Sequence, residues 1–153
     1  MDIEGLIREY IEKTVHMSLA TVSDGKPWVC EVHFGYDDNL NIYFVSKQTT
    51  RHCREIAANK HVAGNIVKQH TLEDSPYGVY FEGNAQIIEN PSDEELVSYG
   101  IRLKRDKKAL REILNDDNGH RMYKISISNW ALFGKFGQSP SKKYELVWND
   151  SSK

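Results

Sequence analysis

Residues 41–59 read Asn41-Ile-Tyr-Phe-Val-Ser-Lys-Gln-Thr-Thr-Arg-His-Cys-Arg-Glu-Ile-Ala-Ala-Asn59. The apolar and aromatic start, Ile42 to Val45, is typical of a β-strand. The end places Cys53, Ile56 and Ala57 at helical spacing. A strand, a polar corner and a short helix are therefore expected to follow one another here.

The corner between this strand and this helix has the composition of an anion site. Thr49 or Thr50 is expected to cap the helix, leaving backbone N–H groups free at the positive end of the helix dipole. These groups, the hydroxyls and the Arg51 guanidinium together suit a phosphate. An ordinary corner with solvated charges is the alternative, and this stretch alone leaves both readings open.

Length and charge restrict the class of protein. The 153 residues suit one domain spanning residues 1–153, and 20 Lys and Arg face 22 Asp and Glu, a net charge of -2. This balance argues against nucleic-acid binding, which needs a basic face. No apolar run approaches the roughly 18 residues of a membrane span, and the acidic N-terminus lacks a signal-peptide pattern. We therefore expect a soluble, cytoplasmic protein that binds neither nucleic acid nor membrane.

The rest of the chain alternates mostly with strand period. Strands are predicted over residues 17–22, 28–34, 42–45, 61–67, 77–88, 122–128 and 144–148. Asp24-Gly25 marks a hairpin turn, Gly83 a bulge or close backbone approach, and residues 129–137 a loop rich in Gly and aromatics. A first helix capped by Asp2 and a helical region from the Ser92 capping box to about residue 114, kinked near residues 105–106, complete the chain. This pattern predicts a mainly β (α+β) fold, a small antiparallel barrel with flanking helices.

Several short motifs occur in a fixed order along the first two thirds of the chain. They are Leu19-Ala20-Thr21-Val22, Asp24-Gly25-Lys26-Pro27, the Val29 to Val32 strand, Tyr43-Phe44-Val45-Ser46, Thr50-Arg51-His52, Val62-Ala63-Gly64 and the strand from Gly78 to Ala85. In this order and spacing, over residues 14–90, the chain resembles the pyridoxamine-5′-phosphate-oxidase-like FMN-binding split barrels. Gly134-Lys135-Phe136-Gly137 is similar to one small bacterial branch of that family. The resemblance implies an antiparallel split β-barrel.

The resemblance also implies a site. Members are homodimers that hold FMN in a groove between the two subunits. The residues matching cofactor-binding positions are Val29, Cys30, Glu31 and Val32 along the ring, and Val45, Ser46, Lys47, Thr50, Arg51 and His52 toward the phosphate. His52 stands where many members carry Lys, so phosphate binding is expected to weaken as its imidazole loses its proton. Gln69 is expected at the ring edge or in a solvated loop, and Trp130 against the flavin or in core or interface packing.

The expected function is that of an FMN flavoprotein, an oxidoreductase passing hydride through flavin N5 to or from an unknown small molecule, with a nicotinamide cofactor as one partner. No side chain stands out as a catalytic acid or base. The basic strand and Arg-containing C-terminal motif of true pyridoxamine phosphate oxidases are missing. The alternatives are a non-enzymatic FMN or haem carrier on the same barrel and a reductase using deazaflavin F420. The six histidines lack paired-ligand spacing, so no metal site is predicted.

Overall fold

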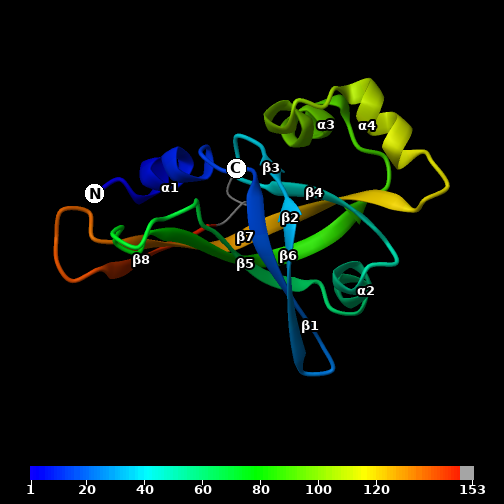
Figure 1. Ribbon diagram of the computed structural model, residues 1–153. Coiled ribbons are helices and arrows are strands. Elements are labelled where there is room, and N and C mark those ends of the chain that lie inside the picture. The colour runs from blue at the N-terminus through cyan, green and yellow to red at the C-terminus, as the bar shows by residue number, and fades with distance from the viewer. Residues whose placement is uncertain (149–153) are drawn as a thin grey trace.

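One curled antiparallel sheet forms the body of the computed structural model, which describes residues 1–148 (Figure 1). Its strands are β1 (His16–Ser23), β2 (Lys26–His33), β3 (Gly35–Tyr36), β4 (Ile42–Lys47), β5 (His61–Ile66), β6 (Gly78–Ile88), β7 (His120–Gly134) and β8 (Lys142–Val147). They lie in the order β2-β1-β5-β6-β7-β4-β3, and β8 pairs with β7. The architecture is the split β-barrel with flanking helices that the sequence predicts.

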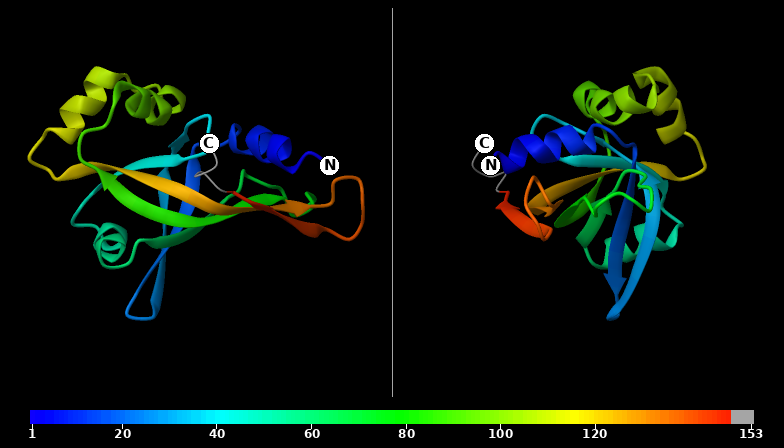
Figure 2. Two further views of the ribbon diagram at one scale, coloured as in Figure 1. Left: turned by 180° about the vertical axis from the view of Figure 1, so that it is seen from behind. Right: turned by 60° about the vertical axis from the view of Figure 1, so that its left-hand side comes forward.

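Four α-helices flank the sheet: α1 (Ile3–Ile11), α2 (Arg51–Ala58), α3 (Asp93–Gly100) and α4 (Lys107–Leu114). A 3-10 turn, η1 (Ile101–Leu103), follows α3. Both views of Figure 2 show α3 and α4 at one end of the curled sheet and α2 beside the projecting β1–β2 hairpin. No helix within residues 1–148 has the length and apolar character needed to cross a bilayer.

The β1–β2 hairpin follows from its turn. Asp24 and Gly25 both have positive φ, 53° and 72°, the conformation that two-residue hairpin turns of the right twist require. Both strands extend further toward this turn than predicted, to Ser23 and Lys26. Strands β1 and β2 therefore pair without interruption from His16 opposite His33 to Ser23 opposite Lys26.

The predicted irregularity at Gly83 is confirmed. The pairing of β6 with β7 shifts register between Glu82 and Gly83. A Cβ at Gly83 would lie 2.2 Å from the carbonyl oxygen of Ser126, closer than any side chain tolerates. The glycine therefore permits the close approach of the two backbones.

Two sequence predictions are wrong. Residues 129–134 are not a loop but the second half of β7, which is paired with β6 on one side and β8 on the other. The helical region after Ser92 is broken rather than kinked. Lys104 has φ 55°, and Asp106 then caps α4 by accepting a 2.8 Å hydrogen bond from the Ala109 N–H. The Ser92–Glu95 capping box is present as expected.

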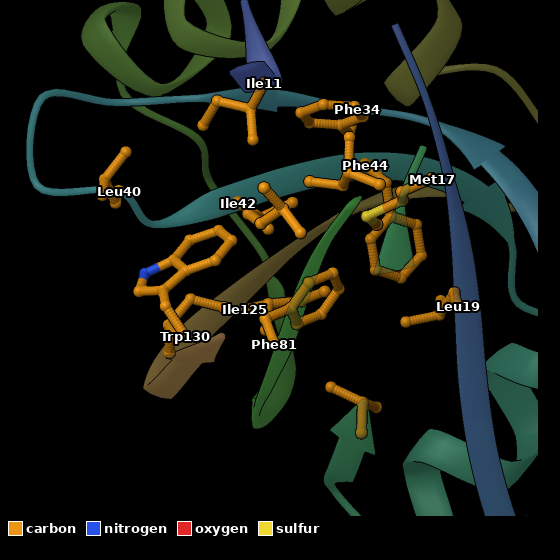
Figure 3. Packing of buried hydrophobic residues seen from close by; sticks show 14 of the residues in the cluster. Ile11, Met17, Leu19, Phe34, Leu40, Ile42, Phe44, Phe81, Ile125 and Trp130 are labelled. Carbon is orange, nitrogen blue, oxygen red and sulfur yellow. The ribbon is translucent and has the colours of Figure 1, made fainter. Parts of the chain in front are cut away.

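The core fills the inside of the curled sheet (Figure 3). Met17, Leu19, Phe44, Phe81 and Trp130 point into it from β1, β4, β6 and β7, and α1 covers it through Ile11. A second, smaller cluster lies under α3 and α4; its buried members are Tyr43, Leu96, Tyr99, Leu110 and Met122. Strand β4 contributes Ile42 and Phe44 to the first cluster and Tyr43 to the second, so it is packed on both faces before the corner where it ends.

Candidate functional site

The N-terminus of α2 begins at a hydroxyl cap. The Thr50 Oγ1 accepts a 3.4 Å hydrogen bond from the Cys53 N–H and donates one of 2.8 Å to the Lys47 carbonyl oxygen. Thr50, rather than Thr49, is thus the cap. Five residues lie where β4 ends and α2 begins, and they are called the α2 corner below: Ser46, Lys47, Thr50, Arg51 and His52. Lys47 is exposed.

His52 faces inward at this corner. Its Nε2 lies 2.9 Å from the Ser46 Oγ and 3.4 Å from the Thr50 Oγ1, and only 8% of the residue is exposed. Burial lowers the pKa of His52 below its ordinary value of 6.5, because desolvation penalises the charged imidazolium. The ring is therefore neutral at pH 7. It supplies a hydrogen-bonding group to the corner rather than the second cation that a lysine would supply.

Arg51 is held by two partners. Its Nε donates a 2.9 Å hydrogen bond to the Glu55 Oε2, one turn further along α2, and its guanidinium lies 4.2 Å from the centre of the Trp28 ring. Glu55 also accepts a 2.7 Å hydrogen bond from the Thr21 Oγ1. The Glu55 carboxylate thus offsets part of the Arg51 charge, and the corner is less cationic than its sequence suggests.

Strand β2 supplies a free backbone edge next to the α2 corner. It is the last strand of the sheet, and within residues 1–148 no strand pairs with its outer side. The Phe34 N–H donates a hydrogen bond to the Val15 carbonyl oxygen. Because hydrogen-bonded pairs alternate along an antiparallel pair, the backbone groups of every second residue of β2 also point toward β1, namely those of Val32, Cys30 and Trp28. The N–H and C=O groups of Val29 therefore point to the open edge.

The same alternation divides the side chains of β2. Cys30 and Val32 pack against the core, whereas Val29 is 60% exposed. The exposed Glu31 shares the outer face and the open backbone edge with Val29. Burial, with a smaller contribution from Cys53, raises the pKa of the Cys30 thiol to about 11. The thiol is therefore protonated at neutral pH, which excludes it as a thiolate nucleophile.

The structure places the side chains of three further predicted cofactor-binding residues away from the α2 corner and β2: Val45, Gln69 and Trp130. Val45 packs its side chain against the cluster under α3 and α4. Gln69 lines a separate cavity of about 390 Å³ beside Tyr10, His70 and Tyr77, and none of the α2-corner residues borders that cavity.

Trp130 is fully buried, with its ring 5.8 Å from that of Phe81. A ring with no exposed surface packs the core and does not stack on a ligand, so the structure favours the packing alternative. The register shift between Glu82 and Gly83 reverses the alternation of β7, so that Ile127 and Trp130 both face the core.

Sequence reasoning missed Trp28, Thr21 and Glu55. The four-residue spacing of Arg51 and Glu55 on one helix face could have revealed their ion pair. The hairpin register also brings Thr21 directly opposite Trp28, beside α2. The packing of α2 on the hairpin could not be predicted from the sequence, because the contacting segments lie more than twenty residues apart.

Two histidines meet at the far end of β2. His16 and His33 are cross-strand neighbours with ring centres 4.4 Å apart, and the His16 Nδ1 lies 3.9 Å from the Glu31 Oε1. Burial and the nearby His16 lower the pKa of His33. Across residues 1–148 no group of three or more His, Cys, Asp or Glu side chains could hold a metal ion.

Comparisons with known proteins agree with this fold. The chain is similar to the haem storage protein HutZ of Vibrio cholerae (TM-score 0.67, 17% identity, 96% of this chain and 95% of that one). It is also similar to ChuZ of Campylobacter jejuni (TM-score 0.75, 14% identity, 98% of this chain and 63% of that one). A third similar structure is a haem-binding protein of Mycobacterium smegmatis (TM-score 0.66, 16% identity, 90% of this chain and 57% of that one).

This chain therefore spans less than two thirds of the length of two of these three proteins. Among curated protein sequences there is no match. The family model described as pyridoxamine 5′-phosphate oxidase matches residues 3–133, most of the chain. The protein belongs to the pyridoxamine 5′-phosphate oxidase family.

Proposed function

We propose that this protein is a flavoprotein that binds FMN along β2 and at the α2 corner. The observation that carries the proposal is the free backbone edge of β2, which adjoins a capped helix N-terminus bearing Arg51. Hydroxyls, helix N–H groups and a guanidinium suit a phosphate monoester. Fixed backbone donors and acceptors suit the polar edge of a flavin ring. The residues present thus fit FMN, which when bound would supply hydride transfer through its N5.

The partner in this proposal is a second copy of the chain. The outer face of the sheet exposes apolar side chains, among them Val29 on β2 and Tyr80 on β6. Exposed apolar surface of this kind on a sheet favours association. A homodimer would cover this face and close a groove over β2.

The absorption spectrum of the purified full chain, before and after incubation with FMN, tests the proposal. Bound FMN gives flavin bands that stay with the protein through gel filtration. A protein that remains colourless after incubation contradicts it.

Arg51→Ala gives the sharper test. Removing a guanidinium that contacts a phosphate should weaken FMN binding about tenfold or more, whereas riboflavin, which lacks the phosphate, should bind almost as before. Fluorescence titration measures both dissociation constants. Equal losses for the two flavins would contradict the phosphate assignment.

The reaction within this proposal is electron transfer between flavin and a small molecule. Anaerobic mixing of the FMN-loaded protein with NADH or NADPH tests the nicotinamide partner by loss of the flavin bands. A flavin that neither nicotinamide reduces would instead favour the carrier function. Deazaflavin F420 gives its own absorption spectrum and is tested in the same titration.

Haem is the second candidate ligand. It is favoured by the His16–His33 pair on the exposed sheet face, because neutral imidazoles ligate iron. An intense Soret band after incubation with haem that His33→Ala removes would support it. Haem binding that is unchanged in both His16→Ala and His33→Ala would contradict it.

A further inference from the structure

Four side chains in contact with one another form a network from the protein interior to the surface beside α2: Thr21, Glu55, Arg51 and Trp28. Thr21 and Glu55 are 3% and 8% exposed, whereas 40% of Trp28 is exposed. Hydrogen bonds of 2.7 and 2.9 Å link Thr21 to Glu55 and Glu55 to Arg51, and Arg51 then lies over the Trp28 ring. These contacts join three elements, β1, α2 and β2. Figure 1 shows α2 beside the β1–β2 hairpin.

The charged state of Glu55 depends on Thr21 and Arg51. A carboxylate as buried as that of Glu55 is stable in its charged form only when donors and a cation compensate it. Thr21 and Arg51 supply them, and the hydrogen bonds from these two side chains lower the pKa of Glu55 despite its burial. Glu55 is therefore a fixed anion at neutral pH, anchored from the β1 side.

This anchor uses only part of the Arg51 guanidinium. Its Nε is taken by Glu55 and its flat face by Trp28. Among residues 1–148 neither terminal nitrogen of Arg51 has a hydrogen-bond partner, so both remain able to donate. A guanidinium fixed on two sides loses little further side-chain entropy when it binds an anion.

We infer that Glu55 and Trp28 are positioning residues that hold the Arg51 guanidinium ready for the phosphate of the ligand. This inference rests on the proposed function, since it assumes a phosphorylated ligand at the α2 corner. Neither residue contributes a positive charge. Their effect on affinity arises from the orientation of Arg51, with Thr21 fixing the carboxylate that orients it.

Two variants that conserve charge separate orientation from electrostatics. Glu55→Asp withdraws the carboxylate by one methylene, and Trp28→Leu removes the stacking surface. Each should raise the dissociation constant of FMN about tenfold and that of riboflavin less than about twofold. In the Arg51→Ala background the same changes should have no further effect on FMN, because the residue that they orient is gone.

Glu4→Asp is the matched control. Glu4 pairs with Arg8 at 2.9 Å one turn apart on α1, so it repeats the Glu–Arg pair away from the α2 corner. It should leave both dissociation constants unchanged. Because Glu55 is buried, far-ultraviolet circular dichroism of each variant accompanies the titrations, and the more exposed Trp28→Leu tests the inference at a site less needed for folding.

Glu55→Gln distinguishes the competing explanation. If Glu55 merely repels the phosphate, Glu55→Gln binds FMN more tightly and Glu55→Asp resembles the wild type, and the inference is overturned. A wild type that prefers FMN, loses the preference in Arg51→Ala and keeps it in both Glu55→Asp and Trp28→Leu also overturns it, while the proposed function stands. A wild type that binds neither flavin overturns both.

Discussion

At the scale of single residues, His52 shows how burial changes the meaning of a motif. The sequence places an imidazole beside Lys47 and Arg51, and an ionised ring would add a third positive charge there. The structure buries the ring against Ser46 and Thr50 and lowers its pKa. Lys47 and Arg51 are therefore the charged groups of the α2 corner at neutral pH. Burial depends on how α2 packs, and no local pattern of residues reveals it.

The lowered pKa of His52 makes stability depend on pH. In the unfolded chain the His52 imidazole is protonated near pH 6.5, whereas in the folded protein it is protonated only at lower pH. Stability is therefore full above about pH 6.5 and falls as the pH drops through that value toward the folded-state pKa. Urea unfolding at pH 7.5 and pH 5.5 should show a smaller decrease for His52→Gln than for the wild type.

His61→Gln is the control for that measurement, because His61 is exposed at the start of β5. Its pH dependence should match the wild type. The pKa of His33 is also lowered, so His33 contributes to the loss of stability at pH 5.5. It is present in the wild type and in both variants, so its contribution cancels in the comparison. An equal decrease in His52→Gln and the wild type would show that the imidazole is not buried as described.

At the scale of elements, local signals predicted turns and caps well and strand lengths poorly. The Asp24-Gly25 turn and the Ser92 capping box depend on short-range chemistry, and each lies where the sequence predicts it. For α2 the sequence left Thr49 and Thr50 open as the cap, and the structure selects Thr50. Residues 129–134 look like a loop because of their composition, yet β6 and β8 hold them as a strand. The hydrogen-bond partners of that strand come from distant segments, so tertiary pairing overrides composition.

The bulge at Gly83 permits a direct test of the β6–β7 packing. Gly83→Ala forces a methyl group to within 2.2 Å of the Ser126 carbonyl oxygen unless the backbones separate. Overpacking of this kind should lower the free energy of unfolding by about 2 kcal/mol. Thermal or urea unfolding measures the loss.

Glu82→Ala is the neighbouring control, since Glu82 is exposed on the same strand. Its effect should stay within about 0.5 kcal/mol. If Gly83→Ala were as stable as Glu82→Ala, the two backbones would not approach as closely as described.

At the scale of the whole molecule, the order of motifs predicted the split barrel, and the sheet order confirms it. The hairpin and the α2 corner could each be placed from the sequence. Their contact through Trp28 and Arg51 could not, because it joins an exposed indole to a helix that follows after two further strands. The cavity that Gln69 lines with Tyr10 and Tyr77 could not be predicted either, because it also joins distant segments.

The proposed dimer gives a prediction at this scale. Val29→Asp places a charge on the exposed sheet face, where the side chain makes little contribution to the core. Burial of an unpaired carboxylate in an interface is costly, so the variant should sediment as a monomer where the wild type sediments as a dimer. Sedimentation velocity at equal concentrations measures both.

Leu72→Asp serves as the control, because Leu72 is fully exposed in the loop between β5 and β6. It should sediment like the wild type. A wild type that is monomeric at all concentrations would contradict the dimer and, with it, the closed groove over β2.

The open edge of β2 has a consequence for solubility. Unpaired N–H and C=O groups that can receive a ligand can equally receive a strand from another molecule, which is how sheets aggregate. Pro27 offers no N–H at the start of this edge, and the exposed Lys26 and Glu31 place opposite charges along it. These features discourage the addition of a foreign strand while leaving the main chain of Val29 accessible. Strand β2 thus combines exposure to a small molecule with resistance to polymerisation.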